Sequence, residues 1–398
     1  MKINPIMYQN FNGHAAGPIK ALYMQNAGNQ TQINLYNQMR EIGQKEGFDV
    51  FIHDGNELID GHISKPYKSA NMFGVWSQDN KFFINKDGKE ILLSCQVYNE
   101  PEQEEAIELA SLANIESWTT ELVLDGGNVY IGKKKDGKNY FITTYDTLEL
   151  CAGFQYLKSI LGDDIDFKTY DKFLSKKTLK NKLTQKKAST KEYFENNDKW
   201  IKKALGVISE DFSVELEDII IIPKPEYHID LSIRPLEYPY ILVDDDKLVD
   251  ENLRKLEEEF GDELKFKIFK QRIKNKLKEK RETYSSSDEI CKKLEEHGFI
   301  PIRIAGGYGL GNINFMNAIV HKNKGKLSYI TNSAICGNIY LEYLQGLFEE
   351  DLRKKCPQIE KIYFIDGGMS KNNSNTILDY LKKYKGAIHC LCNEQMEE

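Results

Sequence analysis

The alternation of short apolar runs with amphipathic segments is the feature that most constrains the fold of this chain. Tight turns join some of the runs. Asp87-Gly88 lies between the runs 81–85 and 91–95, and Asp136-Gly137 precedes the run 140–144. Asp-Gly is a strong hairpin signal and indicates antiparallel pairs, whereas strands alternating with helices favour parallel ones. We therefore expect an α/β protein with mixed sheets, in which a strand–strand–helix–strand unit recurs about five times.

Start and stop signals for helices lie between these runs. Asp146-Thr147-Leu148-Glu149 matches a capping box, and Gly162 is a natural stop for the helix it would open. Ser286 begins a similar pattern that ends near Gly298. With amphipathic periodicity, these signals predict helices at 30–47, 103–114, 146–162, 248–282, 286–298, 337–354 and 373–384.

The segment 163–207 differs from its surroundings because it is rich in lysine. Such a charge pattern is typical of a solvated surface. We interpret the segment as a mostly helical, peripheral insertion in a single domain that spans residues 1–398.

Composition narrows the class of protein and of partner. The 398 residues are 40% hydrophobic, enough for a large core, and the net charge of −7 argues against nucleic-acid binding. Neither a signal peptide nor an apolar run of about 18 residues is apparent, so we expect no membrane partner. The seven cysteines are scattered without a C-x-x-C pair, which predicts reduced thiols, a cytoplasmic location, and neither metal nor cofactor. The sequence leaves open whether the chain forms a homo-oligomer or is exported by a specialised system.

Several isolated side chains are candidates for chemistry. His228 and Asp230 are two apart on a predicted strand, so their side chains would share a face. Asp125 precedes Gly126-Gly127, which we interpret as a bulge within a strand. Asp79 alone would be a turn residue, and Cys390 alone a buried apolar one. None of these side chains identifies a function by itself.

Together the candidates fit the binding of a guanidinium group. This planar cation is always charged, and carboxylates pair with it through two hydrogen bonds. Asp79 and Asp230 could hold it, and its charge would favour the thiolate of Cys390 as a nucleophile. His228 could then act as general acid and base, oriented by Asp125.

In this order the residues resemble the guanidine-modifying enzymes of the pentein superfamily, above all the agmatine deiminases and bacterial-type peptidylarginine deiminases. The resemblance runs from about residue 74 onward and is carried by five short motifs. They are Trp76-Ser77-Gln78-Asp79, Asp125-Gly126-Gly127-Asn128, His228-Ile229-Asp230, Asn314-Phe315 with Asn317-Ala318-Ile319-Val320, and Gly386-Ala387-Ile388-His389-Cys390.

The resemblance implies a five-bladed α/β propeller, the pentein fold, and a deiminase that converts a guanidinium to a ureido group through a thiouronium on Cys390. The substrate would be agmatine, arginine or a protein arginine side chain. Asp79 and Asp230 would bind the guanidinium, and Asn314, Trp76 and Asn128 would complete the substrate site. Because His389 would alternate to the opposite face of the Cys390 strand from Cys392, His228 is the expected acid and base.

The chain departs from the family pattern at several points. Gln78 replaces an arginine, Asn80-Lys81 replaces a Gly-Pro neighbourhood, Ala387 replaces a glycine, and the first 70 residues lack the family's Trp-Glu-Pro-His start. We interpret these changes as retained guanidine chemistry with an altered substrate. Two alternatives stay open: an amidinotransferase using the same site, and a non-catalytic pentein that binds a partner. A papain-like protease is disfavoured because His228 precedes Cys390 in the chain.

Overall fold

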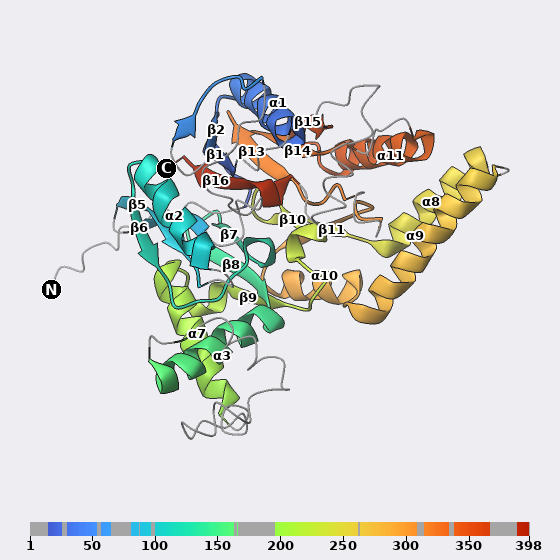
Figure 1. Ribbon diagram of the computed structural model, residues 1–398. Helices are drawn as coiled ribbons and strands as arrows, with labels where there is room; N and C mark the ends of the chain where they lie inside the picture. Colours follow the sequence, from blue (N-terminus) through green and yellow to red (C-terminus); the bar gives the residue numbers. More distant parts are fainter. Residues whose placement is uncertain are drawn as a thin grey trace.

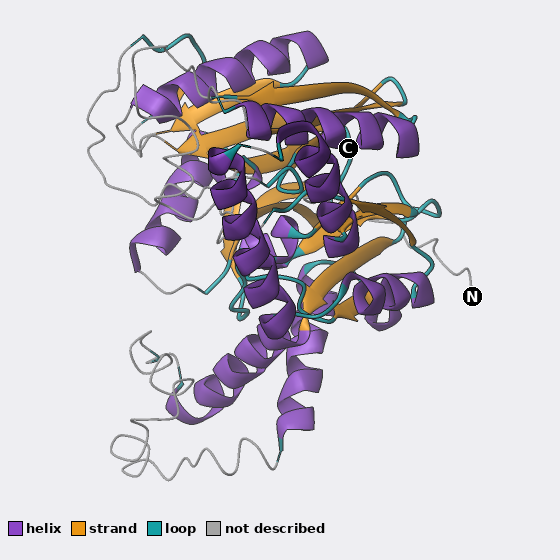
Figure 2. Ribbon diagram, turned by 90° about the vertical axis from the view of Figure 1, so that its right-hand side faces the viewer, coloured by secondary structure: helices purple, strands orange, loops and turns teal. Residues whose placement is uncertain are grey.

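The computed structural model describes residues 15–25, 30–53, 57–64, 81–86, 88–96, 100–162, 165, 196–261, 263–308, 314–333, 338–366 and 388–397. Within these residues the strands form five separate sheets, four with three strands and one with four. The sheets lie toward the interior of the molecule, and most helices lie outside them (Figures 1 and 2).

Every sheet repeats one arrangement of strands and helices. In one unit, β7 (Tyr130–Lys133) pairs antiparallel with β8 (Asn139–Thr144). Helix α3 (Tyr145–Leu161) follows, and β9 (Ile219–Ile222) then pairs parallel with β8. Antiparallel neighbours need only a tight turn, whereas the parallel neighbour needs a crossover, here a helical one. The expected strand–strand–helix–strand unit is therefore confirmed.

Three other units repeat this order. One contains β4 (Lys81–Lys86), β5 (Lys89–Ser94), α2 (Glu100–Leu112) and β6 (Glu116–Thr119). The next contains β10 (Ile233–Pro235), β11 (Tyr240–Asp244), α8 (Asp246–Phe260), α9 (Leu264–Thr283), α10 (Ser287–Glu296) and β12 (Ile300–Ile304). The third contains β13 (Ile319–Asn323), β14 (Lys326–Asn332), α11 (Ile339–Lys355) and β15 (Ile359–Ile365).

The remaining sheet is assembled from segments far apart in the chain. Strand β1 (Ile19–Gln25) is followed by α1 (Gln30–Glu46) and the parallel strand β2 (Asp49–His53), with β3 (Leu58–Ile59) at the edge. Strand β16 (Cys392–Met396) pairs antiparallel with β1 and so takes the place of the first strand of the unit. The pairing aligns Met24 with Cys392 and Tyr23 with Asn393.

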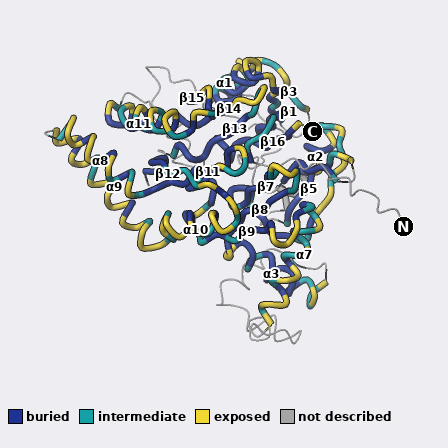
Figure 3. The backbone as a smooth tube through the Cα atoms, turned by 180° about the vertical axis from the view of Figure 1, so that it is seen from behind, coloured by how far each residue is buried: buried dark blue, intermediate teal, exposed yellow. Residues whose placement is uncertain are grey.

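Apolar packing between the sheets and the outer helices forms the core. The largest cluster joins Leu22 of β1, Ile330 of β14 and Phe348 of α11, all with no exposed surface. In Figure 3 the strands are mostly dark blue, whereas much of α8, α9 and α10 is yellow. The buried strands and half-exposed helices follow the patterns that predicted them.

The two capping boxes predicted from the sequence have different outcomes. The Ser286 side chain and Glu289 form the expected capping box at the start of α10. Gly162, with a φ of 69°, ends α3 as expected. The N-cap of α3, however, is Thr144, whose hydroxyl accepts from the backbone of Thr147. The prediction that Asp146 opens this helix is wrong: the helix begins at Tyr145, and its N-cap lies two residues before Asp146.

The lysine-rich segment 163–207 lies largely outside the described residues, but its end is the start of α7 (Asn197–Asp211). Helix α7 packs against α3 and buries Trp200, Ala204 and Ile208 in an apolar cluster. This part of the predicted insertion therefore contributes to the core. The pair α8 and α9 projects from the body (Figure 1). None of the helices in the described ranges combines the length and apolarity needed to span a bilayer.

The fold predicts a contrast between two leucines. Leu22→Ala empties a fully buried position in β1 and should lower the free energy of unfolding by about 2–5 kcal/mol. Leu264→Ala, at a position 72% exposed, should change it by less than about 0.5 kcal/mol. Equilibrium denaturation measures both, and equal stability of the two variants would contradict the assignment of β1 to the core.

Candidate active site

Three short turns carry the candidate side chains, and each lies just before the first strand of a unit. They are the 3₁₀ helices η1 (Gly126–Asn128) before β7, η4 (Ile229–Leu231) before β10, and η5 (His389–Leu391) before β16. The sequence predicted strands at all three places, and this prediction is wrong. A short polar–apolar alternation cannot distinguish a strand from one tight turn leading into a strand.

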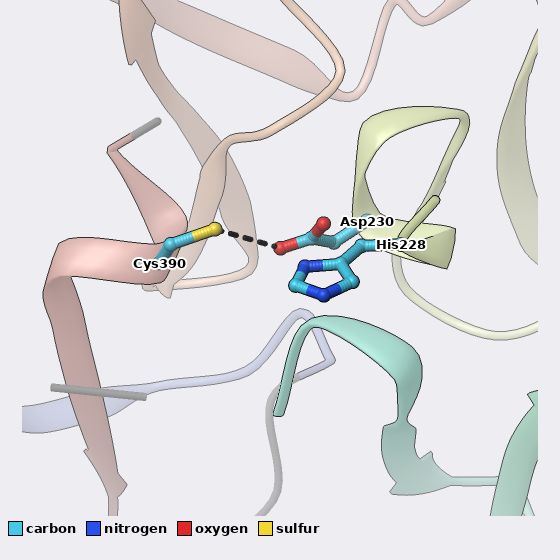
Figure 4. Close-up of side chains that lie close together, drawn as sticks. All are labelled: His228, Asp230 and Cys390. Carbon is cyan, nitrogen blue, oxygen red and sulfur yellow. Dashed lines mark hydrogen bonds between the residues drawn. The ribbon is translucent and has the colours of Figure 1, made fainter. Parts of the chain in front are cut away.

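The turns bring His228, Asp230 and Cys390 together, as predicted from the sequence (Figure 4). One ligand-type atom of each residue lies within 4.8 Å of the others. The thiol of Cys390 donates to Asp230 Oδ2 across 3.4 Å, and both side chains are almost fully buried. A thiol, a carboxylate and an imidazole from η4 and η5 therefore share one small space.

Asp125 and Gly127 hold the imidazole of His228 from the side of η1. The Asp125 carboxylate lies 2.9 Å from His228 Nε2, and its other oxygen accepts from the Gly127 backbone across 2.9 Å. A Cβ atom at Gly127 would overlap the His228 ring. The glycine is needed for this close approach, and the Asp125 carboxylate lies against the imidazole.

Burial makes Asp230 the most perturbed carboxyl group of the cluster. Loss of hydration raises its pKa to about 6, although the neighbouring His228 lowers it. Its Oδ2 atom accepts from Asn317 Nδ2 at 2.7 Å as well as from Cys390. Its Oδ1 atom has no hydrogen-bond partner among the described residues. An open, buried acceptor beside a thiol is suited to a cationic donor.

Asn314 supports the site through the backbone and through Asn317. Its Nδ2 donates to the carbonyl of Leu231 across 2.7 Å, and its Oδ1 accepts from the backbone of Met316 and of Asn317. Asn317 then donates to both Asp230 and Cys390, the latter across 3.3 Å. Reasoning from the sequence quoted Asn317 within a motif but gave it no role.

His389 is the second residue that the sequence interpretation missed. We expected it on the opposite face of a strand, but in η5 its Nδ1 lies 3.1 Å from Asp230 Oδ2. The tighter winding of a 3₁₀ turn carries adjacent side chains around the axis instead of alternating them. Cys392 is buried in β16, and burial raises the pKa of its thiol well above the usual range.

Two predicted residues, Trp76 and Asp79, lie outside the described residues. Asn128 lies in η1, partly buried, and its carbonyl accepts from the Thr143 hydroxyl across 3.0 Å. Its place in a substrate site stays a prediction.

The cluster contains residue types that also bind metals. Thiol, imidazole and carboxylate are all ligands of Zn²⁺. Here, however, His228 Nε2 faces the Asp125 carboxylate, and Asp230 Oδ2 is occupied by donors from Asn317 and Cys390. These groups fit acid–base and nucleophilic chemistry without a metal, and we interpret the cluster in that way.

Comparison with known proteins identifies the fold. No protein-family model and no curated protein matches the sequence. Among solved structures, a provisionally named peptidyl-arginine deiminase is similar with a TM-score of 0.52 and 13% identity, covering 99% of this chain and 100% of the other. An agmatine deiminase of Enterococcus faecalis is similar with a TM-score of 0.51 and 12% identity, covering 98% of this chain and 96% of the other. The chain thus has the mixed α/β fold of agmatine deiminase-like pentein proteins, and its sheets fit their pseudo-fivefold arrangement.

The contact between η1 and η4 predicts a specific effect of a small substitution. Gly127→Ala should displace the His228 ring and break its pair with Asp125. The matched control is Gly206→Ala in α7, where an added Cβ meets nothing within 4 Å. NMR spectra of the histidine rings should show a shifted His228 signal in the first variant alone. An unchanged His228 signal in Gly127→Ala would refute this geometry.

Proposed function

We propose that this chain is a hydrolase that converts a guanidinium group to a ureido group and releases ammonia, with Cys390 as nucleophile. The observation that carries this proposal is that Asp230 Oδ1, buried next to the Cys390 thiol, has no hydrogen-bond partner among the residues that the structure describes. A guanidinium is a strong donor whose charge never titrates near neutrality. It would donate to the Asp230 oxygen that has no partner among the described residues, and it would bring a positive charge next to this buried carboxylate.

The same geometry supports a sequence of bond changes. The Cys390 thiol gives its proton to His228, the sulfur attacks the central carbon of the bound guanidinium, and an S–C bond forms. His228 donates a proton to one nitrogen, the C–N bond breaks, and ammonia leaves a thiouronium on the sulfur. His228 next takes a proton from water, whose oxygen attacks the same carbon. Cleavage of the S–C bond then releases the ureido product, His228 returns its proton to the sulfur to restore the thiol, and the second proton of the water leaves to solvent.

The proposed site has further members. Asp125 would keep the imidazole of His228 in the orientation needed for both proton transfers. Asp79 would pair with the second edge of the guanidinium, and Trp76, Asn128 and Asn314 would contact the rest of the substrate. Closure of the sheets into a five-bladed propeller would bring these segments to one pocket. Similarity of the fold to agmatine deiminase supports this arrangement.

The substrate class is agmatine, free arginine or arginine within a protein. A screen of these compounds by mass spectrometry, with ammonia measured in parallel, tests the proposal. A ureido product with an equivalent of ammonia is the expected result. Transfer of the amidino group to an added amine, without ammonia, would instead identify an amidinotransferase. A chain that changes none of these guanidines by either route would refute the proposed reaction.

Replacement of the nucleophile should abolish turnover. Cys390→Ala is expected to lower the rate of ureido formation by about 10³-fold or more, because covalent catalysis is lost. It should also remove labelling by a haloacetamidine reagent. Cys291→Ala, which alters a buried thiol in α10, provides the matched control and should retain both properties. Labelling that persists in Cys390→Ala would contradict the assignment.

The raised pKa of Asp230 predicts how substrate binding depends on pH. The carboxyl group becomes protonated as the pH falls through about 6 and then cannot pair with the cation. The KM for the guanidinium substrate should therefore be constant above this pH and rise about tenfold per unit below it. Steady-state kinetics between about pH 4.5 and about pH 8 test this expectation, because this range includes the pKa of Asp230. A flat KM through the acidic range would show that Asp230 does not bind the cation as a carboxylate.

A further inference from the structure

A row of buried polar side chains extends from Asp230 through the protein. His389 Nδ1 lies 3.1 Å from Asp230 Oδ2, and His389 Nε2 lies 3.7 Å from Glu394 Oε1. Arg234 Nη2 then lies 3.6 Å from the same Glu394 oxygen. All four side chains have no exposed surface. Carboxylate, imidazole, carboxylate and guanidinium thus follow one another between η4, η5, β16 and β10.

Burying such a row of polar side chains costs free energy of folding. A buried ion loses several kcal/mol of hydration, and buried ion pairs often stabilise a fold no better than apolar residues of similar volume. Arg234 remains charged at any ordinary pH. Its guanidinium lies over the Tyr130 ring at 5.4 Å, and Glu394 is the carboxylate next to it. The row ends at Asp230, in the candidate active site.

We propose that His389 is a positioning residue, held by the Arg234–Glu394 pair, that fixes the Asp230 carboxylate with Oδ1 directed to the guanidinium. This inference rests on the proposed function. It goes beyond it by assigning a role to three residues that neither touch the reacting carbon nor take part in the bond changes.

The hydrogen bonds around Asp230 show how the positioning works. His389 acts on Oδ2 directly through Nδ1, and its backbone N–H also donates to Asn317 Oδ1 across 2.8 Å. Asn317 in turn donates to the same Oδ2. Oδ2 is therefore held from several directions, whereas nothing in the described part of the chain bonds to Oδ1. Rotation of the carboxylate would lose these contacts together.

Arg234 and Glu394, at the far end of the row, determine whether the His389 imidazole bonds to Asp230 or to Glu394. An ionised Asp230 accepts only, so His389 Nδ1 must carry a proton to bond it. Glu394 could compete from the other side of the ring, but Arg234 lies at the same Glu394 oxygen and balances its charge. The Tyr130 ring, 5.8 Å from that of His389, restricts the imidazole further. Arg234 and Glu394 thus bias the ring toward Asp230.

Two substitutions of His389 separate positioning from packing. His389→Leu keeps an apolar side chain of similar size but removes the donor, and we expect KM for the guanidinium substrate to rise by about 10²-fold. His389→Asn places an amide N–H near the former Nδ1 and should restore KM to within about tenfold of the unaltered chain. Both variants are compared by kcat, KM and thermal unfolding.

His321→Leu provides the matched control for loss of a buried histidine. His321 lies in β13, where its Nδ1 accepts from the Ile19 backbone across 3.0 Å, and it is not part of the row. This variant should lose stability but keep KM. The inference is overturned if His389→Leu keeps the original KM, or if His389→Asn is as impaired as His389→Leu while both remain folded.

A second measurement does not depend on turnover. The rate at which iodoacetamide labels Cys390 is followed by peptide mass mapping, with and without guanidinium ion as protectant. We expect protection in the unaltered chain and in His389→Asn, and its loss in His389→Leu. If the unaltered chain turns over no guanidine but shows this pattern, the reaction is wrong and the positioning role stands. Equal labelling and equal protection in all three proteins would overturn the role whatever the activity.

Discussion

The antiparallel pairing of β16 with β1 is the interaction on which the site depends. It aligns Cys392 with Met24. Because Cys392 is two residues beyond Cys390, this pairing fixes where η5 and the Cys390 thiol lie. The partner strand β1 is in turn joined to the core through Leu22 and the parallel strand β2. The Cys390 thiol therefore has a defined position only when segments from opposite ends of the described chain have met.

The chemistry of the site follows from how little solvent reaches it. Burial raises the pKa of Asp230 to about 6 and that of Glu394 to about 7, even though Arg234 opposes the second shift. A solvated carboxyl group would be fully ionised at either pH. Clusters of perturbed groups are typical of functional sites, where stability is given up for reactivity. A buried cation from the substrate would relieve part of that cost, so binding and folding act on the same carboxylate.

Much of the architecture could be predicted from the sequence, because the signals were local. Asp-Gly turns, apolar runs and the Ser286 capping box each report on a few neighbouring residues, and the order of strands and helices followed from them. The conformations of the site segments could not be predicted in the same way. Whether Ile229–Leu231 or His389–Leu391 forms a turn or a strand depends on packing between distant units. For the same reason His389 was assigned to the wrong face, and the row from Asp230 to Arg234 has no sequence signature at all.

The turns that carry the site side chains lie outside the strands of the sheets. Each site segment precedes the first strand of a different unit, and each unit has hydrogen bonds between its own strands. A side chain in one of these turns can be exchanged without altering the ladder of any sheet. The three turns therefore provide separate positions from which side chains reach one cluster. A side chain can therefore change at one of these turns while the side chains of the cluster at the other two keep their positions.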